Sequence, residues 1–257
     1  MENAVRPLDD HVPPEVNSGL GPDAPLQWLR QGLHDFVINS GTSLIYGLAV
    51  VAAGYLIFGL TTGKPYLFLG AVSGFFLVSP LLAAGLYEVS RRHSRGEPVG
   101  FFDSLAGLRR NGQSLADFGF VLAFAMMVWQ MLSALLFAFQ FRGVTTDAEG
   151  FANSLFLSSD SLLFLLSYLA LGGVIAAAVF AISAISVPML LDREVDVVTA
   201  MMTSVRAVKA NIPAMAVWAG LLVGLTLVGF ITLLAGLAVI VPVLGHASWH
   251  AYKALVK

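Results

Sequence analysis

The sequence predicts an all-α fold, a polytopic membrane bundle of about six transmembrane helices. Its 257 residues are 57% hydrophobic and only 12% charged, whereas soluble domains are about 45–50% apolar and about 25% charged. The apolar residues also lie in continuous runs long enough to cross the roughly 30 Å of a bilayer's hydrocarbon core. Because these runs do not alternate with polar residues, they predict helices and not strands.

The first 25 residues differ from the rest of the chain. They hold five of the eleven prolines and five acidic residues against a single arginine. We therefore predict a disordered, acidic, proline-rich tail over residues 1–25 and a single transmembrane domain over residues 26–257. The domain begins with apolar side chains at helical spacing, which predicts an amphipathic helix lying on the membrane surface. These side chains are Leu26, Leu29, Leu33 and Phe36.

The candidate spans are six apolar segments. The last two come from one run, residues 212–244, which as a single helix would be about 50 Å long at 1.5 Å per residue. Because that length exceeds a bilayer, we divide the run near Gly229 and Thr232. Pro80 lies inside the second span and predicts a kink there. The predicted spans cover about residues 42–62, 66–89, 115–141, 162–189, 212–229 and 233–252.

The distribution of basic residues predicts the orientation. Lys and Arg near span ends favour the cytoplasmic side of a membrane. With six spans and both termini in the cytoplasm, twelve of the fourteen Lys and Arg residues lie on that side. Only Lys64 and Arg142 lie on the other side. Five spans would move Lys253 and Lys257 outward and weaken the bias, so six spans are the better prediction.

Two polar connections resemble each other at a constant offset of 100 residues. The segments Ser104–Asn111 and Ser204–Asn211 share Ser, two apolar positions, a basic residue and Asn. Each has an apolar helical face, and each follows a span with a proline, Pro80 or Pro188. We infer a parallel internal repeat with interfacial amphipathic helices on the cytoplasmic side. The alternative is that amphipathic connections between spans look alike without a common origin.

Five arginines follow the second span. They are expected first to orient the chain, and they are also candidates for binding anionic lipid headgroups, at about 1 kcal/mol per basic residue. Glu88 precedes them and is expected to form a surface pair of little net energy. The five are Arg91, Arg92, Arg95, Arg109 and Arg110.

Two histidines near the C-terminus are the candidate metal ligands. His246 and His250 are four residues apart, so they share one helix face and have the spacing of a metal-binding pair. A metal would need a further donor, for which Glu88 and His93 are the candidates. The alternative is an ordinary aromatic and basic belt at the membrane interface. Its members would be Trp249, Tyr252 and Lys253.

Polar residues inside the predicted spans are few. Gln130 lies near a bilayer centre and is expected to form an interhelical hydrogen bond, and Asp117 is expected to cap the start of the third span. The pairs Gly70–Gly74 and Gly220–Gly224 form small-residue faces for close helix packing, within the chain or against a partner. No catalytic motif is present and no cofactor is predicted, and a net charge of −2 gives no basic field for nucleic acid.

Three segments resemble a known family. The runs Ser43–Gly47, Gly74–Arg92 and Pro242–Tyr252, with the motif Pro-Leu-x-Ala-x-Gly-Leu-Tyr-Glu in the second, are similar to bacterial integral membrane proteins catalogued as a domain of unknown function. The resemblance covers about residues 26–256 and implies a proteobacterial inner-membrane protein. Some similar proteins are labelled as a cytochrome c oxidase subunit. Because this chain lacks mid-span histidines, that label implies an accessory subunit and brings no catalytic residues.

These features favour a non-enzymatic accessory or assembly subunit that contacts the lipid bilayer and packs against another membrane protein. The partner would be a larger membrane complex, such as a respiratory one, or a second copy of the chain. The first alternative is a small-molecule or lipid transporter or channel. A polar cavity lined by Gln130, Ser73, Ser79, Ser133, Thr226 and Thr232 would favour it. The second alternative is a metal-binding membrane enzyme that uses His246 and His250.

Overall fold

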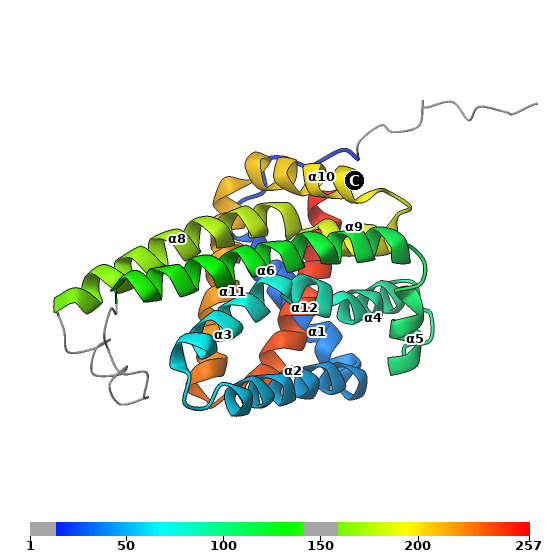
Figure 1. The fold of residues 1–257 in the computed structure, drawn as a ribbon. Coiled ribbons are helices and arrows are strands. Elements are labelled where there is room, and N and C mark those ends of the chain that lie inside the picture. The colour runs from blue at the N-terminus through cyan, green and yellow to red at the C-terminus, as the bar shows by residue number, and fades with distance from the viewer. Residues whose placement is uncertain (1–13, 141–158) are drawn as a thin grey trace, which may run out of the picture.

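A computed structural model describes residues 14–140 and 159–257 (Figure 1). Within those ranges every regular element is a helix, apart from an isolated bridge between Val16 and Val256. The predicted all-α class is therefore confirmed. Residues 1–13 of the predicted tail, and Arg142 in the predicted outer loop, lie outside the described ranges.

Four helical segments of the described ranges are long and apolar enough to cross a membrane: Ser40–Leu60, Gly112–Phe139, Leu162–Asp192 and Ile212–Ile231. They match four of the six predicted spans. The other two, residues 66–89 and 233–252, fall on α3 with the start of α4 and on α12. The helices are α1 (Ala24–Ile38), α2 (Ser40–Leu60), α3 (Pro65–Leu82), α4 (Ala84–Ser94), α5 (Phe101–Gly107), α6 (Gly112–Gln140), α8 (Ser159–Ser183), α9 (Ser186–Asp192), α10 (Val197–Ala210), α11 (Ile212–Ile231) and α12 (Leu237–Leu255).

Two apolar helices are interrupted near a proline. The helix α3 carries Pro80 in its last turn and gives way to α4 at Ala83, and α8 gives way to α9 just before Pro188. Proline has no amide hydrogen, and its ring clashes with the carbonyl group four residues earlier. For Pro188 that carbonyl belongs to Ala184, where α8 has ended. Each apolar helix is thus followed by a short, separate helix that carries charged side chains.

The helix α12 runs through the middle of the bundle, where it packs against α1, α2, α4 and α11 (Figure 1). Two glycines permit this close packing. Backbone atoms of Val243 and Ala247 lie beside Gly32 of α1, and the backbone of Ala238 lies beside Gly47 of α2. A Cβ atom at either glycine would overlap those atoms, so both helices reach α12 because these two positions lack a side chain.

The leucines that predict the apolar face of α1 do not all lie on one side of the helix, because Leu29 packs against the core. Leu26 and Leu33 are 56% and 50% exposed. On the inner face, the Trp28 ring meets the Trp218 ring of α11 edge to face, with centroids 5.8 Å apart. The side with Leu26 and Leu33 is therefore available to a membrane surface, while the opposite side joins the bundle. The buried residues of α1 are Pro25, Trp28, Gly32 and Asp35.

The segment before α1 contacts the end of the chain. The backbone amide of Asn17 donates to the carbonyl of Leu255 at 2.9 Å, and that of Lys257 donates to the carbonyl of Glu15 at 3.1 Å. The side chain of Asn211 accepts a hydrogen bond from the Leu20 amide at 3.0 Å. Specific contacts therefore begin before residue 26, where the sequence placed the start of the folded chain.

The long apolar run near the C-terminus forms two helices, as predicted. The turn between α11 and α12 uses Thr232, whose hydroxyl donates to the Gly229 carbonyl and accepts from the Gly236 amide, both at 2.8 Å. Leu233 and Leu234 have positive φ values of 52° and 71°. Non-glycine residues are strained in this region, and a hydrogen bond of 2.7 Å from the Tyr55 hydroxyl to the Leu233 carbonyl holds the turn.

The two small-residue faces have different surroundings. Gly70 and Gly74 of α3 lie against the side chains of Gln130 and Met126 of α6, so this face packs within the chain. The second face, Gly220–Gly224 of α11, is exposed, and a Cβ atom at either glycine would meet nothing within 4 Å.

The close contact at Gly47 gives a testable prediction. The substitution Gly47→Ala should lower the melting temperature in detergent by several degrees, because overpacking against the α12 backbone costs about 1–3 kcal/mol. The matched control is Gly224→Ala, which should keep or raise the melting temperature, since alanine favours helix by up to about 1 kcal/mol. Equal melting temperatures for Gly47→Ala and the unmodified protein would contradict the close packing of α2 on α12.

Candidate functional site

The carboxylate of Glu88 lies in a cluster of three arginines. Glu88 is 0% exposed. It accepts hydrogen bonds from Arg91 at 2.6 and 2.7 Å, from Arg92 at 2.9 Å and from Arg110 at 2.9 Å. The expectation of a weak surface pair is wrong, because the carboxylate is removed from water and each of its oxygens is bound by a guanidinium group. Burial alone would raise the pKa of Glu88, but the hydrogen bonds and positive charges of the arginines hold it below its ordinary value.

This cluster connects several elements. Gly107 of α5 lies directly over the Glu88 side chain, where a Cβ atom would overlap it. Arg110, which precedes α6, also donates to the carbonyl of Leu191 in α9 at 2.9 Å. The carboxylate of α4 therefore fixes the positions of α5, α6 and α9 around it. We call this end of the molecule, where α4, α5 and α9 meet the C-terminal half of α12, the basic end.

Asp192 forms a second charged cluster at the basic end. It accepts from Arg95 at 2.9 Å, from the Tyr252 hydroxyl at 2.9 Å and from Lys253 at 3.3 Å. Four of the five arginines proposed for lipid headgroups thus have a carboxylate partner. Arg109 is exposed and has no ion pair among the described residues. The side chain of Arg95 is half exposed, so headgroup binding remains a prediction mainly for these two.

A buried chain of hydrogen bonds joins four helices beside the arginine cluster. The Ser90 hydroxyl of α4 lies 2.6 Å from Asp35 Oδ2 of α1 and 2.8 Å from His246 Nδ1 of α12. His246 Nε2 lies 2.9 Å from the hydroxyl of Ser43 in α2. His250 Nε2 lies 2.9 Å from the same Asp35 oxygen. Asp35, Ser43, Ser90 and His246 are all buried.

One arrangement of protons allows all the hydrogen bonds of this buried chain to form together. Ser43 donates to His246 Nε2, His246 donates from Nδ1 to Ser90, and Ser90 donates to Asp35, which needs only a neutral His246. His250 donates from Nε2 to the same carboxylate. Burial alone would raise the pKa of Asp35, but the hydrogen bonds from His250 and Ser90 and the nearby imidazoles hold it below its ordinary value. An ionised Asp35 is therefore the acceptor at the end of the chain.

The structure gives His246 and His250 roles other than a shared metal ion. Both ring nitrogens of His246 are within hydrogen-bond distance of serine hydroxyls, so a metal ion bound by this pair would have to replace one of these contacts and stays a prediction. The alternative of an exposed aromatic belt also differs from the structure, because Trp249 and Tyr252 are 2% and 0% exposed. The face of α12 that carries these residues forms part of the core.

A different set of side chains has the arrangement of metal ligands. His34, Asp35 and His93 bring one potential ligand atom each to within 4.8 Å of one another. The free oxygen of Asp35, Oδ1, lies 3.9 Å from His34 Nδ1, and the side chain of His34 is 69% exposed. These residues come from α1 and α4, so they meet where the two helices flank the buried chain of hydrogen bonds.

Polar residues deep in the bundle contact one another. The Trp129 indole donates to the Ser73 hydroxyl at 2.6 Å, and the Tyr168 hydroxyl lies 3.4 Å from those of Ser73 and Ser133. The Gln130 side chain lies against Gly70 of α3, and its interhelical hydrogen bond stays a prediction. Asp117 is half-buried and accepts from Gln113 at 3.0 Å, so it pairs within its own helix five residues after α6 begins.

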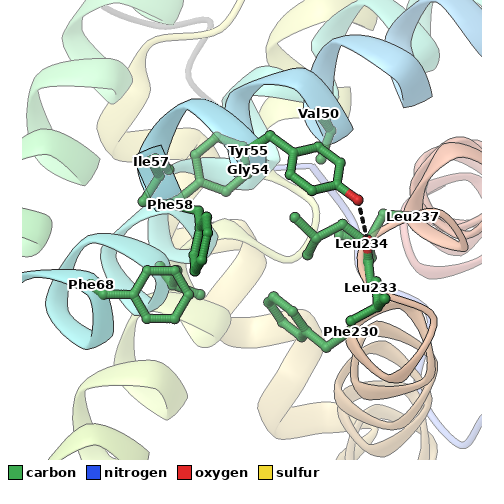
Figure 2. A pocket seen from close by; sticks show the side chains of 12 residues that line it. Val50, Gly54, Tyr55, Ile57, Phe58, Phe68, Phe230, Leu233, Leu234 and Leu237 are labelled. Atoms are coloured by element: carbon green, nitrogen blue, oxygen red, sulfur yellow. Dashed lines mark hydrogen bonds between the residues drawn. The ribbon is translucent and has the colours of Figure 1, made fainter. Parts of the chain in front are cut away.

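Two neighbouring cavities lie between α2, α3 and α12. The larger has a volume of about 350 Å³ and the other of about 300 Å³, and Val50 and Phe75 line both. Figure 2 shows the larger cavity, with aromatic and leucine side chains around it and the Tyr55 hydroxyl bound to the Leu233 carbonyl at its edge. Of the side chains predicted to line a polar cavity, only Ser79 reaches either one, so both are apolar.

Sequence reasoning missed Asp35, Ser43 and Ser90. Their hydrogen bonds to the histidines join residues up to 215 positions apart. One signal was present, because Asp35 stands at helical spacing from Trp28 and Gly32, on the face of α1 that is otherwise apolar or small. An ionisable residue on the packing face of an amphipathic helix indicates a buried partner.

Residues 67–192 match the model of a family described as predicted integral membrane protein (DUF2189). Comparison with curated proteins and with solved structures gives no match. Together with the apolar helices, the family match makes this chain a multi-pass integral membrane protein, similar to a family of unknown function. The matched segment runs from α3 to α9 and includes the Glu88 cluster, Ser90 and His93, whereas Asp35 and the two C-terminal histidines lie outside it.

The Glu88 cluster predicts a specific pH dependence. The variant Glu88→Gln should be less stable at pH 7 by about 3–5 kcal/mol, because three buried or half-buried guanidinium groups lose their counter-charge. A depressed carboxyl pKa stabilises the fold above the ordinary value of 4.5, and this contribution is lost as the pH falls through the lower, folded value. The melting temperatures of the two proteins should therefore begin to converge as the pH falls below 4.5.

The matched control is Glu97→Gln. Glu97 lies 3.5 Å from Arg91, and its side chain is 37% exposed, so its removal should cost about 1 kcal/mol or less at pH 7. A difference between Glu88→Gln and the unmodified protein that stays constant from pH 7 to pH 3 would contradict a stabilising, ionised Glu88.

Proposed function

We propose that this protein is a six-span protein of a bacterial inner membrane and acts as a non-enzymatic accessory or assembly subunit that packs against another membrane complex. The six spans are α2, α3, α6, α8, α11 and α12, and both termini lie in the cytoplasm. The observation that carries the accessory role is that, among the described residues, polar side chains deep in the bundle bind one another. The proposal needs no catalytic residue.

The arrangement of the two ends supports the six-span topology. The α2–α3 and α11–α12 turns lie at the same end, since Phe58 contacts Phe68 at 5.9 Å between ring centroids and Tyr55 binds Leu233. Basic residues gather at the opposite, basic end, where Arg95 and Lys253 share Asp192. Lys and Arg at one end of a bundle favour its cytoplasmic placement.

The order of elements supports the parallel repeat. An apolar helix, a short helix, an amphipathic helix and a second apolar helix follow in α3–α4–α5–α6 and again in α8–α9–α10–α11. The matching asparagines make similar contacts, because the Asn111 amide donates to the Val195 carbonyl at 2.9 Å and the Asn211 amide to the Asn17 carbonyl at 2.8 Å. We propose that the two halves arose as copies of one unit.

The docking surface of the accessory subunit is the open glycine face of α11. A helix of a partner can approach the backbone closely at Gly220 and Gly224, because nothing lies within 4 Å of a Cβ built there. Such small-residue faces allow close helix contact in membranes. The two cavities that lie between α2, α3 and α12 are apolar, which supports an interaction at the outer face of the bundle.

Purification from native membranes in mild detergent at native expression tests the accessory role. We expect respiratory or other membrane subunits at constant stoichiometry, with haem bands if the partner is an oxidase. The double variant Gly220→Ile/Gly224→Ile should lose these subunits, and Gly173→Ile, at another open and exposed glycine, should keep them. A protein that is pure, colourless and alone, or a complex that is insensitive to the α11 variant, would overturn the proposal.

A second candidate function, transport or binding of a lipid, is favoured by the two apolar cavities. They extend side by side along α2, and the larger is bordered by Tyr55 and Phe58, which are 53% and 60% exposed. An acyl chain is the ligand whose shape and chemistry suit a long apolar groove with accessible edges. A polar substrate would find no hydrogen-bonding partners there beyond the Tyr46, Tyr55 and Ser79 side chains.

Native mass spectrometry tests lipid binding. The unmodified protein should retain phospholipid after transfer to mild detergent, and Val50→Trp, which fills the junction of the two cavities, should lose most of it. Val223→Trp places the same side chain on an exposed position of α11, where Val223 is 61% exposed, and should retain the lipid. Equal lipid retention by both variants would exclude the cavities as the binding site.

A further inference from the structure

Three side chains at the basic end form an incomplete coordination sphere. The potential ligand atoms of His34, Asp35 and His93 all lie within 4.8 Å of one another, and the His34 and His93 rings have centroids 6.5 Å apart. Ligands of one metal ion at about 2.1 Å lie somewhat closer together than this. His34 has an exposed side chain that can rotate toward the other two, so a small side-chain movement brings all three to one ion.

The Asp35 carboxylate is held in position by two side chains outside the three-residue cluster. Asp35 Oδ2 accepts hydrogen bonds from Ser90 at 2.6 Å and from His250 at 2.9 Å. Asp35 Oδ1 is left directed toward His34, at 3.9 Å from its Nδ1 atom. In metal sites, such hydrogen bonds orient a coordinating carboxylate and are nearly as important as the ligands. The buried chain that begins at Ser43 and His246 thus ends on a carboxylate with one oxygen available.

The charges around the group also suit a cation. Arg91 and Arg92 lie on the same helix as His93, but both are bound to Glu88. Within the group, Asp35 supplies the carboxylate, and it is 4% exposed. A divalent cation would therefore meet one compensating carboxylate and two imidazoles, with solvent access past His34.

We propose that His34, Asp35 and His93 bind one divalent transition-metal ion. Two imidazoles with one carboxylate are ligands that favour Zn²⁺ or Fe²⁺ over Mg²⁺ or Ca²⁺. Three protein ligands leave coordination positions for water, as in sites that are open to a further ligand. The ion links α1 to α4 and does not use the His246–His250 pair. This inference is independent of the proposed accessory role.

Zinc binding to the purified full-length protein tests the site. The protein carries a tag without histidine, is stripped with a chelator and is then dialysed against Zn²⁺. We expect one zinc per chain by elemental analysis, and a rise in melting temperature with added Zn²⁺. The variants His34→Ala and His93→Ala should each bind zinc at least about tenfold more weakly than the unmodified protein. The control His11→Ala, which removes a histidine outside the group, should bind zinc like the unmodified protein.

Two further measurements decide between this site and unspecific binding. Replacing zinc with Co²⁺ should give visible absorption bands of a bound ion, and these should vanish in the double variant His34→Ala/His93→Ala. Since His34 is exposed, the single variant His34→Ala should keep its melting temperature without metal, which separates lost binding from lost folding. Equal zinc content and equal Co²⁺ spectra in the unmodified protein and the double variant would overturn the proposal.

Discussion

The basic end of this protein depends on one buried carboxylate. Glu88 has no contact with water, and an isolated ion in such a place would cost several kcal/mol. Three guanidinium groups from two stretches of the chain surround it, and Gly107 leaves the space for it. Because α4 supplies both the carboxylate and two of the arginines, while Arg110 precedes α6 and also binds α9, the positions of four elements follow from the need to neutralise one side chain.

The apolar part of the bundle follows a different rule. Hydrocarbon offers no solvent for polar groups, so they must find partners within the protein. Ser73, Trp129 and Tyr168 do so across α3, α6 and α8, and glycines let α1 and α2 reach the backbone of α12. The cavities that remain are apolar. Within the described residues, the charge clusters of Glu88 and Asp192 lie at the basic end.

The buried chain from Ser43 to Asp35 connects these two parts. It runs across four helices and ends beside His34 and His93, at the border between the bundle and solvent. Ser90 and His250 both bind Asp35 Oδ2, which fixes the orientation of the carboxylate and leaves Oδ1 directed toward His34. This network positions the carboxylate that the proposed metal site would use.

Much of the fold follows from the sequence by itself. The long apolar runs, the interruption near Pro80 and the turn at Gly229 and Thr232 depend on composition and on spacing within a few residues, which a sequence displays directly. The buried charge clusters depend on which helices meet. Ser90 lies 55 residues from Asp35, and His250 lies 215 residues from it, so no local pattern could pair them. Only the tertiary structure brought Glu88 inside, gave His246 two serine partners and placed His34 beside His93, because burial and hydrogen-bond partners are properties of packed helices and not of the order of residues.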